Sequence, residues 1–143
     1  MTITTAPTLS LAGLRFIQQT QGLALMPYQD TLGQWRVGYG HAISEDEKEM
    51  PITAERAAML LTVDLLQCQQ ALQQHLTIAL NQPQYDALLG LAFSLNDSGQ
   101  PQLSAIVRYL NRRCFTQALA VWRQIDHDNT FRQQECERFC QPI

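Results

Sequence analysis

The sequence predicts an α+β protein with one helix near the N-terminus, a small β-hairpin region, and a mostly helical lobe around a central apolar helix. Apolar residues recur at helical spacing over residues 10–21 and again from residue 53 onward. Residues 23–50 instead contain glycines, a proline and an alternating apolar run. With 143 residues, 45% of them hydrophobic, the chain is long enough to fill a core. We therefore expect a single domain over residues 1–143, with residues 1–8 as a disordered N-terminal tail.

The first helix has recognisable signals at both ends. Ser10 is a favoured N-cap residue, and Gly22 stands where a helix would end. Between them, Leu11, Leu14 and Ile17 recur at helical spacing, so we expect these three to share one face of the helix.

The β-hairpin region follows this helix. Pro27 and three glycines, Gly33, Gly38 and Gly40, interrupt any helical pattern, and the run QWRVGY alternates and is rich in strand-forming residues. The next segment, ISEDEKEMP (43–51), is polar and acidic, which predicts a solvated loop.

The helical lobe begins at Thr53, the expected cap of a long amphipathic helix whose apolar stripe is Leu61, Leu65, Cys68 and Leu72. Asn81 followed by Gln84 resembles a capping box, and the following stretch, YDALLGLAFSL, is apolar nearly all round. Such a helix belongs in the middle of the domain. Three shorter helices are expected to begin at Ser104, at Thr116 and near Asn129.

The charge of the chain argues against nucleic acid as a partner. Thirteen Asp and Glu outweigh ten Lys and Arg, and the basic residues form no cluster beyond Arg112 and Arg113. The net charge of −3 also disfavours electrostatic capture by the bacterial cell wall, which is itself anionic.

The N-terminal sequence MTITTAPTLSLAGLRF lacks the basic and apolar regions of a secretory signal peptide. The apolar stretches are far shorter than the roughly 18 residues that span a bilayer. We therefore expect no membrane insertion and a cytoplasmic chain as synthesised, with a periplasmic or secreted destination by another route left open.

In that compartment the four cysteines, Cys68, Cys114, Cys136 and Cys140, are expected to be reduced thiols. Cys136 and Cys140 lie four residues apart with His127 upstream, but the spacing is not that of a known zinc module. Small buried side chains at this spacing are far more common, so we expect no metal and no other cofactor.

The segment QTQGLALMPYQDTLGQWRVGYGH (19–41) resembles the active-site signature of the phage-type lysozymes, also called endolysins or muramidases. In that family a Glu ends the first helix before a Gly, an Asp follows nine positions later, and a Thr lies six further on. The stretches 80–96, 105–111, 115–122 and 131–139 resemble the later helices of the same family. The resemblance covers the chain from Leu9 and implies the lysozyme-like α+β fold.

Two positions of the signature depart from the family. Gln21 occupies the position of the catalytic Glu, and Arg36 occupies that of the Thr. A glycosidase needs a carboxylic acid that protonates the leaving glycosidic oxygen, and an amide has no such proton to transfer. The resemblance therefore implies a degenerate catalytic site.

The resemblance makes Asp30 the second carboxylate, although Asp is also favoured in a turn such as DTLG. A guanidinium near a carboxylate tends to form a bidentate pair, so we expect Arg36 to pair with Asp30 and to fill part of the cleft.

Four further residues of the signature are expected to support the site: Tyr28, Gly38, Gly40 and His41. For His41 a structural role is favoured over that of a substitute acid. Another substitute acid could come from the loop that carries Glu45, Asp46, Glu47 and Glu49, although exposed carboxylates keep low pKa values.

Three functions remain open. The chain is a muramidase that cleaves peptidoglycan with Asp30 and a relocated acid, a non-hydrolytic binder of muropeptides or another oligosaccharide, or a module that binds an unidentified protein partner. The missing acid disfavours the first, and Arg36 together with the acidic net charge disfavours the second. We predict a non-hydrolytic protein that binds a protein partner or peptidoglycan fragments, with the muramidase as the alternative.

Overall fold

The computed structural model describes residues 8–95, 100–125 and 130–141. These residues form two compact units, one of residues 15–67 and the other of residues 1–14 with 68–143. Of the tail expected over residues 1–8, residues 1–7 lie outside the described part. Its last residue, Thr8, is described, and its carbonyl accepts a hydrogen bond from Gln82 Nε2 at 2.8 Å. The single domain stays a prediction.

The first helix, α1, spans Leu11–Gln21. Ser10 caps it as expected, because its Oγ accepts a hydrogen bond from the Gly13 amide at 3.0 Å. The face that carries Leu11, Leu14 and Ile17 is only partly buried: Ile17 is buried and Leu14 half-buried, but Leu11 is 62% exposed and Gly13 is buried in its place. The reason is Asp86, whose carboxylate binds the Ser10 amide and hydroxyl, and whose Cγ would lie 2.6 Å from a Cβ at position 13.

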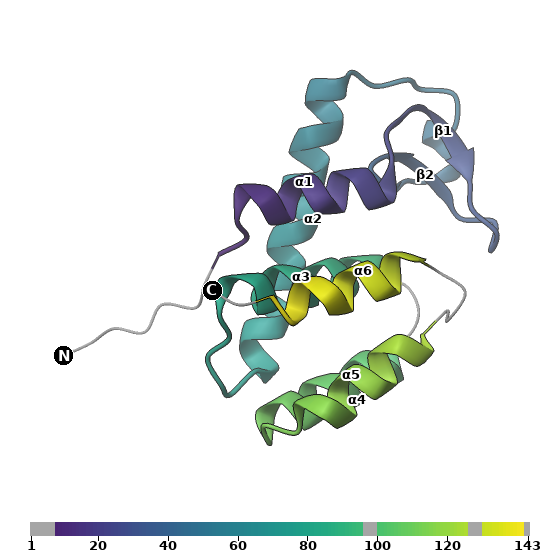
Figure 1. Ribbon diagram of the computed structural model, residues 1–143. Coiled ribbons are helices and arrows are strands. Elements are labelled where there is room, and N and C mark those ends of the chain that lie inside the picture. The colour runs from purple at the N-terminus through teal and green to yellow at the C-terminus, as the bar shows by residue number, and fades with distance from the viewer. Residues whose placement is uncertain (1–7, 96–99, 126–129, 142–143) are drawn as a thin grey trace. The chain divides into compact units, whose positions relative to one another are not determined.

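The predicted β-hairpin is present, and a third short strand extends it within the described residues (Figure 1). The strands β1 (Ala24–Gln29), β2 (Trp35–Gly38) and β3 (His41–Ala42) form an antiparallel sheet in the order β1-β2-β3. Tyr28 pairs with Arg36 across β1 and β2, and Val37 pairs with His41 across β2 and β3. The acidic loop is exposed as predicted, but it also contains a short 3₁₀ helix, η1 (Glu45–Glu47).

The long helix α2 spans Ala54–His75. Thr53 caps it, because its Oγ1 accepts a hydrogen bond from the Arg56 amide at 3.1 Å. Its predicted apolar stripe is confirmed in full, since all four side chains are at most 8% exposed: Leu61, Leu65, Cys68 and Leu72.

The central helix α3 spans Gln82–Ser94, and both of its predicted features are confirmed. Asn81 Oδ1 accepts from the Gln84 amide at 2.9 Å, and Gln84 Oε1 accepts from the Asn81 amide at 3.0 Å. Every residue from Tyr85 to Phe93 is buried, as expected of a helix that is apolar nearly all round.

The remaining helices are α4 (Gln100–Asn111), α5 (Phe115–Gln124) and α6 (Thr130–Phe139). Helix α4 begins four residues before the predicted Ser104, because Pro101 lies in its first turn, where proline favours a helix start. The start expected near Asn129 falls outside the described residues. In Figure 1, α4 lies beside α5 and α6 lies beside α3, and these pairs are in contact.

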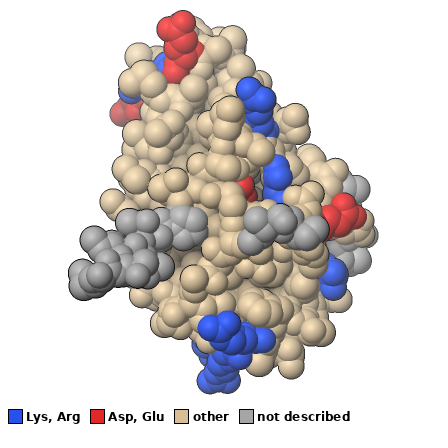
Figure 2. Space-filling model, turned by 60° about the vertical axis from the view of Figure 1, so that its left-hand side comes forward, with Lys and Arg blue, Asp and Glu red and all other residues tan. Residues whose placement is uncertain are grey.

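The surface is sparsely charged, in keeping with a chain that is only 16% Asp, Glu, Lys and Arg. Most of the face shown in Figure 2 is neutral. None of the helices in the described ranges is long and apolar enough to cross a membrane.

Candidate functional site

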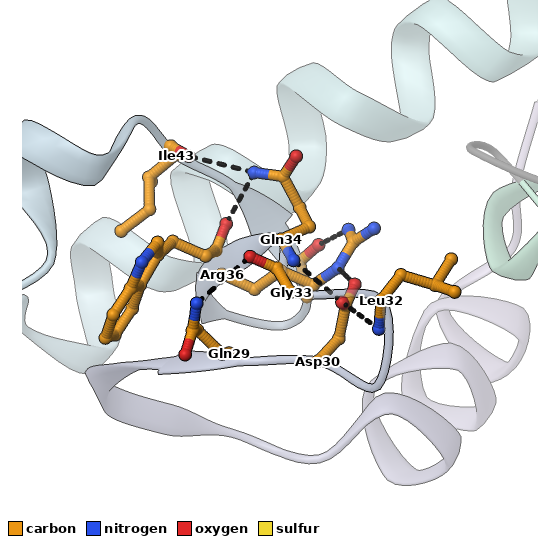
Figure 3. A network of polar contacts seen from close by, with 9 residues as sticks. Gln29, Asp30, Leu32, Gly33, Gln34, Arg36 and Ile43 are labelled. Carbon is orange, nitrogen blue, oxygen red and sulfur yellow. Dashed lines mark hydrogen bonds and ion pairs between the residues drawn. The ribbon is translucent and has the colours of Figure 1, made fainter.

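Asp30 and Arg36 lie together at the hairpin between β1 and β2 (Figure 3). Arg36 Nε donates to Asp30 Oδ2 at 2.7 Å, which is the ion pair expected from the sequence. Asp30 follows the last residue of β1, and Arg36 is the second residue of β2, so the antiparallel register brings the two positions together. Whether Arg36 also fills part of a cleft stays a prediction.

The same carboxylate organises the turn. Asp30 Oδ1 accepts hydrogen bonds from the Leu32 and Gln34 amides, each at 2.9 Å. This is the bonding of an aspartate that stabilises its own turn, which is the turn role considered for Asp30, whereas its role as a second carboxylate stays a prediction. The Arg36 guanidinium, which bonds Asp30, holds the pKa of this carboxyl below its ordinary value of 3.8, and the two backbone amides act in the same direction.

Arg36 is anchored on a second side. Its Nη1 donates to the Gly40 carbonyl at 2.8 Å, so the guanidinium bridges the turn after β1 and the turn after β2. Arg36 is only 19% exposed at its side chain and Asp30 22%, so both groups are largely shielded from water.

Gln21, the last residue of α1, lies next to this bridge. Gly40 has a φ of +82°, which L side chains rarely adopt, and a Cβ at this position would lie 3.3 Å from Gln21 Oε1. Gln21, Asp30, Arg36 and Gly40 are therefore gathered in one place. The sequence grouped these positions only through the resemblance, and the contact of Arg36 with the Gly40 carbonyl was not foreseen.

The other supporting residues occupy the sheet around this group. Tyr28 is opposite Arg36 in the register and is 37% exposed. Gly38 has a φ of +72°, and a Cβ there would meet Ala57 Cβ at 3.2 Å, so the close approach of α2 requires glycine. His41 bonds through Nδ1 to Asp64 Oδ2 at 2.8 Å, which agrees with the structural role favoured for this histidine.

Asp64 was missed in the sequence, because a single aspartate on a long amphipathic helix carries no signal of its partner. A second missed group is buried between α5 and α6. One oxygen of Glu135, Oε1, accepts from Trp122 Nε1 at 3.1 Å and from Arg132 Nη1 at 2.8 Å. Burial raises the pKa of Glu135 to about 7, while Arg132 and Trp122 act in the opposite direction.

The carboxylates proposed as substitute acids are exposed. Within the acidic loop, Glu45 forms a 3.5 Å ion pair with Lys48, and Glu47 accepts a weak 3.4 Å hydrogen bond from Ser44. No contact joins them to Asp30 or Gln21 among the interactions that the described residues make.

The cysteines form no disulfide within the described part of the chain. Cys136 is buried, and this burial raises the pKa of its thiol to about 11. The third member of the group considered as a metal site, His127, lies outside the described residues. The residues that the structure does describe contain no group of three side chains suited to hold a metal ion.

The helix, three-stranded sheet and helical lobe define a lysozyme-like α+β protein, and comparison with known proteins assigns its family. The phage lysozyme family matches residues 18–136. The chain is 31% identical over 127 residues to the endolysin of Salmonella phage P22, covering 84% of this chain and 86% of that one. It is 36% identical over 87 residues to an endolysin of Acyrthosiphon pisum secondary endosymbiont phage 1, covering 61% and 59%. The chain therefore belongs to the phage lysozyme family.

Solved structures agree with this assignment. The muramidase domain of SpmX from Asticaccaulis excentricus superposes with a TM-score of 0.81 at 27% identity, over 94% of this chain and 99% of that one. A mutant of P22 lysozyme superposes with a TM-score of 0.74, also at 27% identity and over the same shares of the two chains. These likenesses confirm the predicted lysozyme-like fold.

Proposed function

We propose that this chain is a phage lysozyme relative that does not hydrolyse peptidoglycan at an ordinary rate and that acts by binding. The observation that carries the proposal is the state of Asp30. Its carboxylate accepts from the Arg36 guanidinium and from two backbone amides, so both oxygens are already bonded to this chain. A carboxylate held in this way is poorly placed to stabilise positive charge on a sugar ring or to orient a water.

The second support is the amide at position 21. General acid catalysis contributes about 10² to 10⁴-fold, and groups that act as a unit lose more than the sum of their parts. Gln21 can donate a hydrogen bond to a sugar oxygen, but it cannot transfer a proton. The proton donor is thus replaced by an amide, and in the same small region the remaining carboxylate, Asp30, is bonded to Arg36.

A protein partner is the ligand that we favour over peptidoglycan fragments. Large apolar side chains are exposed in the unit of residues 15–67, among them Met26, Leu32, Met59 and Val63, at 53% to 80%. Met59 and Val63 lie four residues apart on α2 and therefore share a face, and contiguous apolar surface is typical of protein interaction sites. Peptidoglycan fragments are the second candidate because relatives of this chain carry the name endolysin, but a net charge of −3 provides no long-range attraction to an anionic polymer.

The test is hydrolysis of purified peptidoglycan by four proteins: the natural chain, Gln21→Glu, Gln21→Glu with Arg36→Thr, and Gln19→Glu. The last is a matched control, because Gln19 is an exposed amide on the same helix. We expect the natural chain and the control to be inert. We expect the double variant to gain at least about 10²-fold, since it regains a proton donor and frees Asp30.

Hydrolysis by the natural chain at the rate of the double variant would overturn the proposal. If the double variant is folded but inert, positions 21 and 36 do not by themselves explain the loss. Retention of the natural chain on insoluble peptidoglycan would favour peptidoglycan fragments as the ligand, and failure to be retained would favour a protein partner.

The alternative function is a muramidase with a relocated acid, for which the acidic loop is the nearest source in the sequence. The combined change Glu45→Gln, Asp46→Asn, Glu47→Gln and Glu49→Gln tests it directly. If the natural chain cuts peptidoglycan and this variant does not, the alternative holds and the binding role is wrong.

A further inference from the structure

The charges of this chain are segregated along its sequence. Residues 98–125, which include α4 and α5, contain four arginines and no aspartate or glutamate. The rest of the chain holds the other six basic residues and all thirteen acidic ones. An acidic protein therefore carries a helical pair that is purely cationic, and nothing in the proposed function above uses it.

Three of these arginines form what we call the arginine patch: Arg108, Arg112 and Arg113, all of them exposed. Arg108 and Arg112 are four residues apart on α4 and its end, so they lie on one face, and Arg113 follows in the turn to α5. None of the three side chains has an ion pair or hydrogen bond within the described part of the chain. Figure 2 shows basic side chains at its lower end, where α4 and α5 lie in Figure 1, with no acidic side chain beside them.

The turn that carries the patch is held firmly in place. Asn111 Oδ1 accepts from the Thr77 amide at 2.9 Å, and Asn111 Nδ2 donates to the His75 carbonyl at 2.8 Å. Two amides of the turn close the end of α4: the Arg113 amide bonds the Leu110 carbonyl at 2.9 Å, and the Cys114 amide bonds the Tyr109 carbonyl at 2.8 Å. These two bonds are the Schellman motif that often ends a helix.

Arg113 occupies the position of this motif where glycine is preferred. Its φ is +61°, and it is the one residue other than glycine with a positive φ in the described ranges. A left-handed conformation costs an L residue with a Cβ roughly 1 kcal/mol. The favourable placement of cations at a helix C-terminus explains Arg108 and Arg112, but it does not explain why the chain accepts this strain at position 113. A conformationally costly side chain in an exposed turn points to a role in binding.

We propose that the arginine patch docks this protein on a membrane surface that contains anionic phospholipids. Charge complementarity is one support, because the guanidinium fork matches the oxygens of a phosphate headgroup. The second support is the absence of an apolar centre. In the described part of α4 and α5 the exposed side chains are polar, charged or small, as in Thr116 and Gln117.

This composition favours a headgroup layer over a protein. A stable protein interface needs about 800 Å² from each partner with an apolar centre, whereas adsorption on headgroups needs only charge. The overall charge of −3 does not prevent it, because charges farther away than a Debye length of about 10 Å are largely screened at ordinary ionic strength.

Co-sedimentation with vesicles tests the proposal. The natural chain is mixed with vesicles of phosphatidylglycerol and phosphatidylcholine, or of phosphatidylcholine alone, at low and high salt. We expect binding to the anionic vesicles only, and release at high salt. Arg112→Gln with Arg113→Gln should weaken binding roughly fivefold for each arginine removed. The matched control, Arg15→Gln with Arg56→Gln, removes the same charge from exposed positions outside α4 and α5 and should bind as the natural chain does.

Arg113→Gly separates binding from folding. Because glycine relieves the strain at φ +61°, we expect this variant to melt at a higher temperature and yet to bind anionic vesicles about fivefold more weakly. A purely structural role would not couple a gain of stability to a loss of binding.

Four outcomes would overturn the proposal. They are no binding to anionic vesicles at low salt, equal weakening in the control pair, unchanged binding by Arg113→Gly, and binding to soluble polyglutamate or polyphosphate without binding to vesicles. The last of these would assign the patch to an acidic protein or to a free phosphate polymer instead of a membrane.

Discussion

Helix α3 and the β1–β2 hairpin differ in how well the residues at their key positions match what the family resemblance predicts. In α3 the local signals and the packing match the prediction: the capping box is complete, and the whole run from Tyr85 to Phe93 is buried. In the hairpin the turn is equally well formed around Asp30, yet Arg36 in β2 and Gln21 at the end of α1 are the two positions that the sequence predicts to depart from the family signature. A fold and an activity depend on different residues, so the family fold can form where residues of the predicted signature differ.

If this separation holds, the largest effects on stability come from α3 and almost none come from the signature. Leu88 is fully buried, so Leu88→Ala should lower the free energy of unfolding by about 2–5 kcal/mol. Gln21→Ala should change it by less than about 0.5 kcal/mol, because Gln21 is only half-buried. Urea unfolding followed by circular dichroism measures both. A loss at Gln21 as large as that at Leu88 would show that the signature is retained for folding.

The next largest effect on stability comes from Glu135, a polar group in the core of the same lobe as α3. In the folded protein its pKa is about 7, above the ordinary value of 4.5, so the folded state keeps a proton that the unfolded chain has already released. Stability should therefore fall by roughly 3 kcal/mol as the pH rises from about 4.5 to about 7, and then level off.

Glu135→Gln should remove this dependence, since the amide does not titrate and still offers an oxygen to Trp122. Unfolding curves at a series of pH values measure the effect. Glu137→Gln is the matched control, because Glu137 is exposed on the same helix and should leave the slope unchanged. If the free energy of unfolding of Glu135→Gln still depends on pH in this range, another titrating group causes the dependence.

The same comparison explains what could be predicted from the sequence. The stripe of α2 and the capping box of α3 were predicted correctly because they depend on residues close together in the sequence. The exposed Leu11 was not predicted, because the face that α1 buries is decided by Asp86, more than seventy residues away. The His41 pair with Asp64 was missed for the same reason, because it depends on how β3 and α2 approach one another. The Arg36 contact with Gly40 spans only four residues and was missed because it depends on the conformation of the turn after β2.

A smaller effect tests whether the local signals of α3 contribute stability of their own. Asn81→Ala removes the acceptor for the Gln84 amide and should lower the free energy of unfolding by about 1 kcal/mol. Ser44 is the matched control, because it stands at the cap position of η1 but makes no capping hydrogen bond. Ser44→Ala should thus cost little. Equal losses in the two variants would mean that the capping bonds of Asn81 contribute nothing.

The smallest expected effect is in the hairpin, where the change is in the pKa of Asp30 more than in the free energy of unfolding. Because Arg36 lowers the pKa of Asp30, the pair stabilises the fold at pH values above the ordinary pKa of 3.8, and this contribution is lost as the pH falls through the lowered value. Arg36→Thr should raise the pKa of Asp30 toward 3.8, which NMR titration of the Asp30 carboxyl carbon measures. Arg56→Thr removes an equal charge from an exposed site on α2 and should leave it unchanged. An unaltered pKa in Arg36→Thr would mean that the turn amides alone hold the carboxylate, and that Arg36 does not account for the state of Asp30.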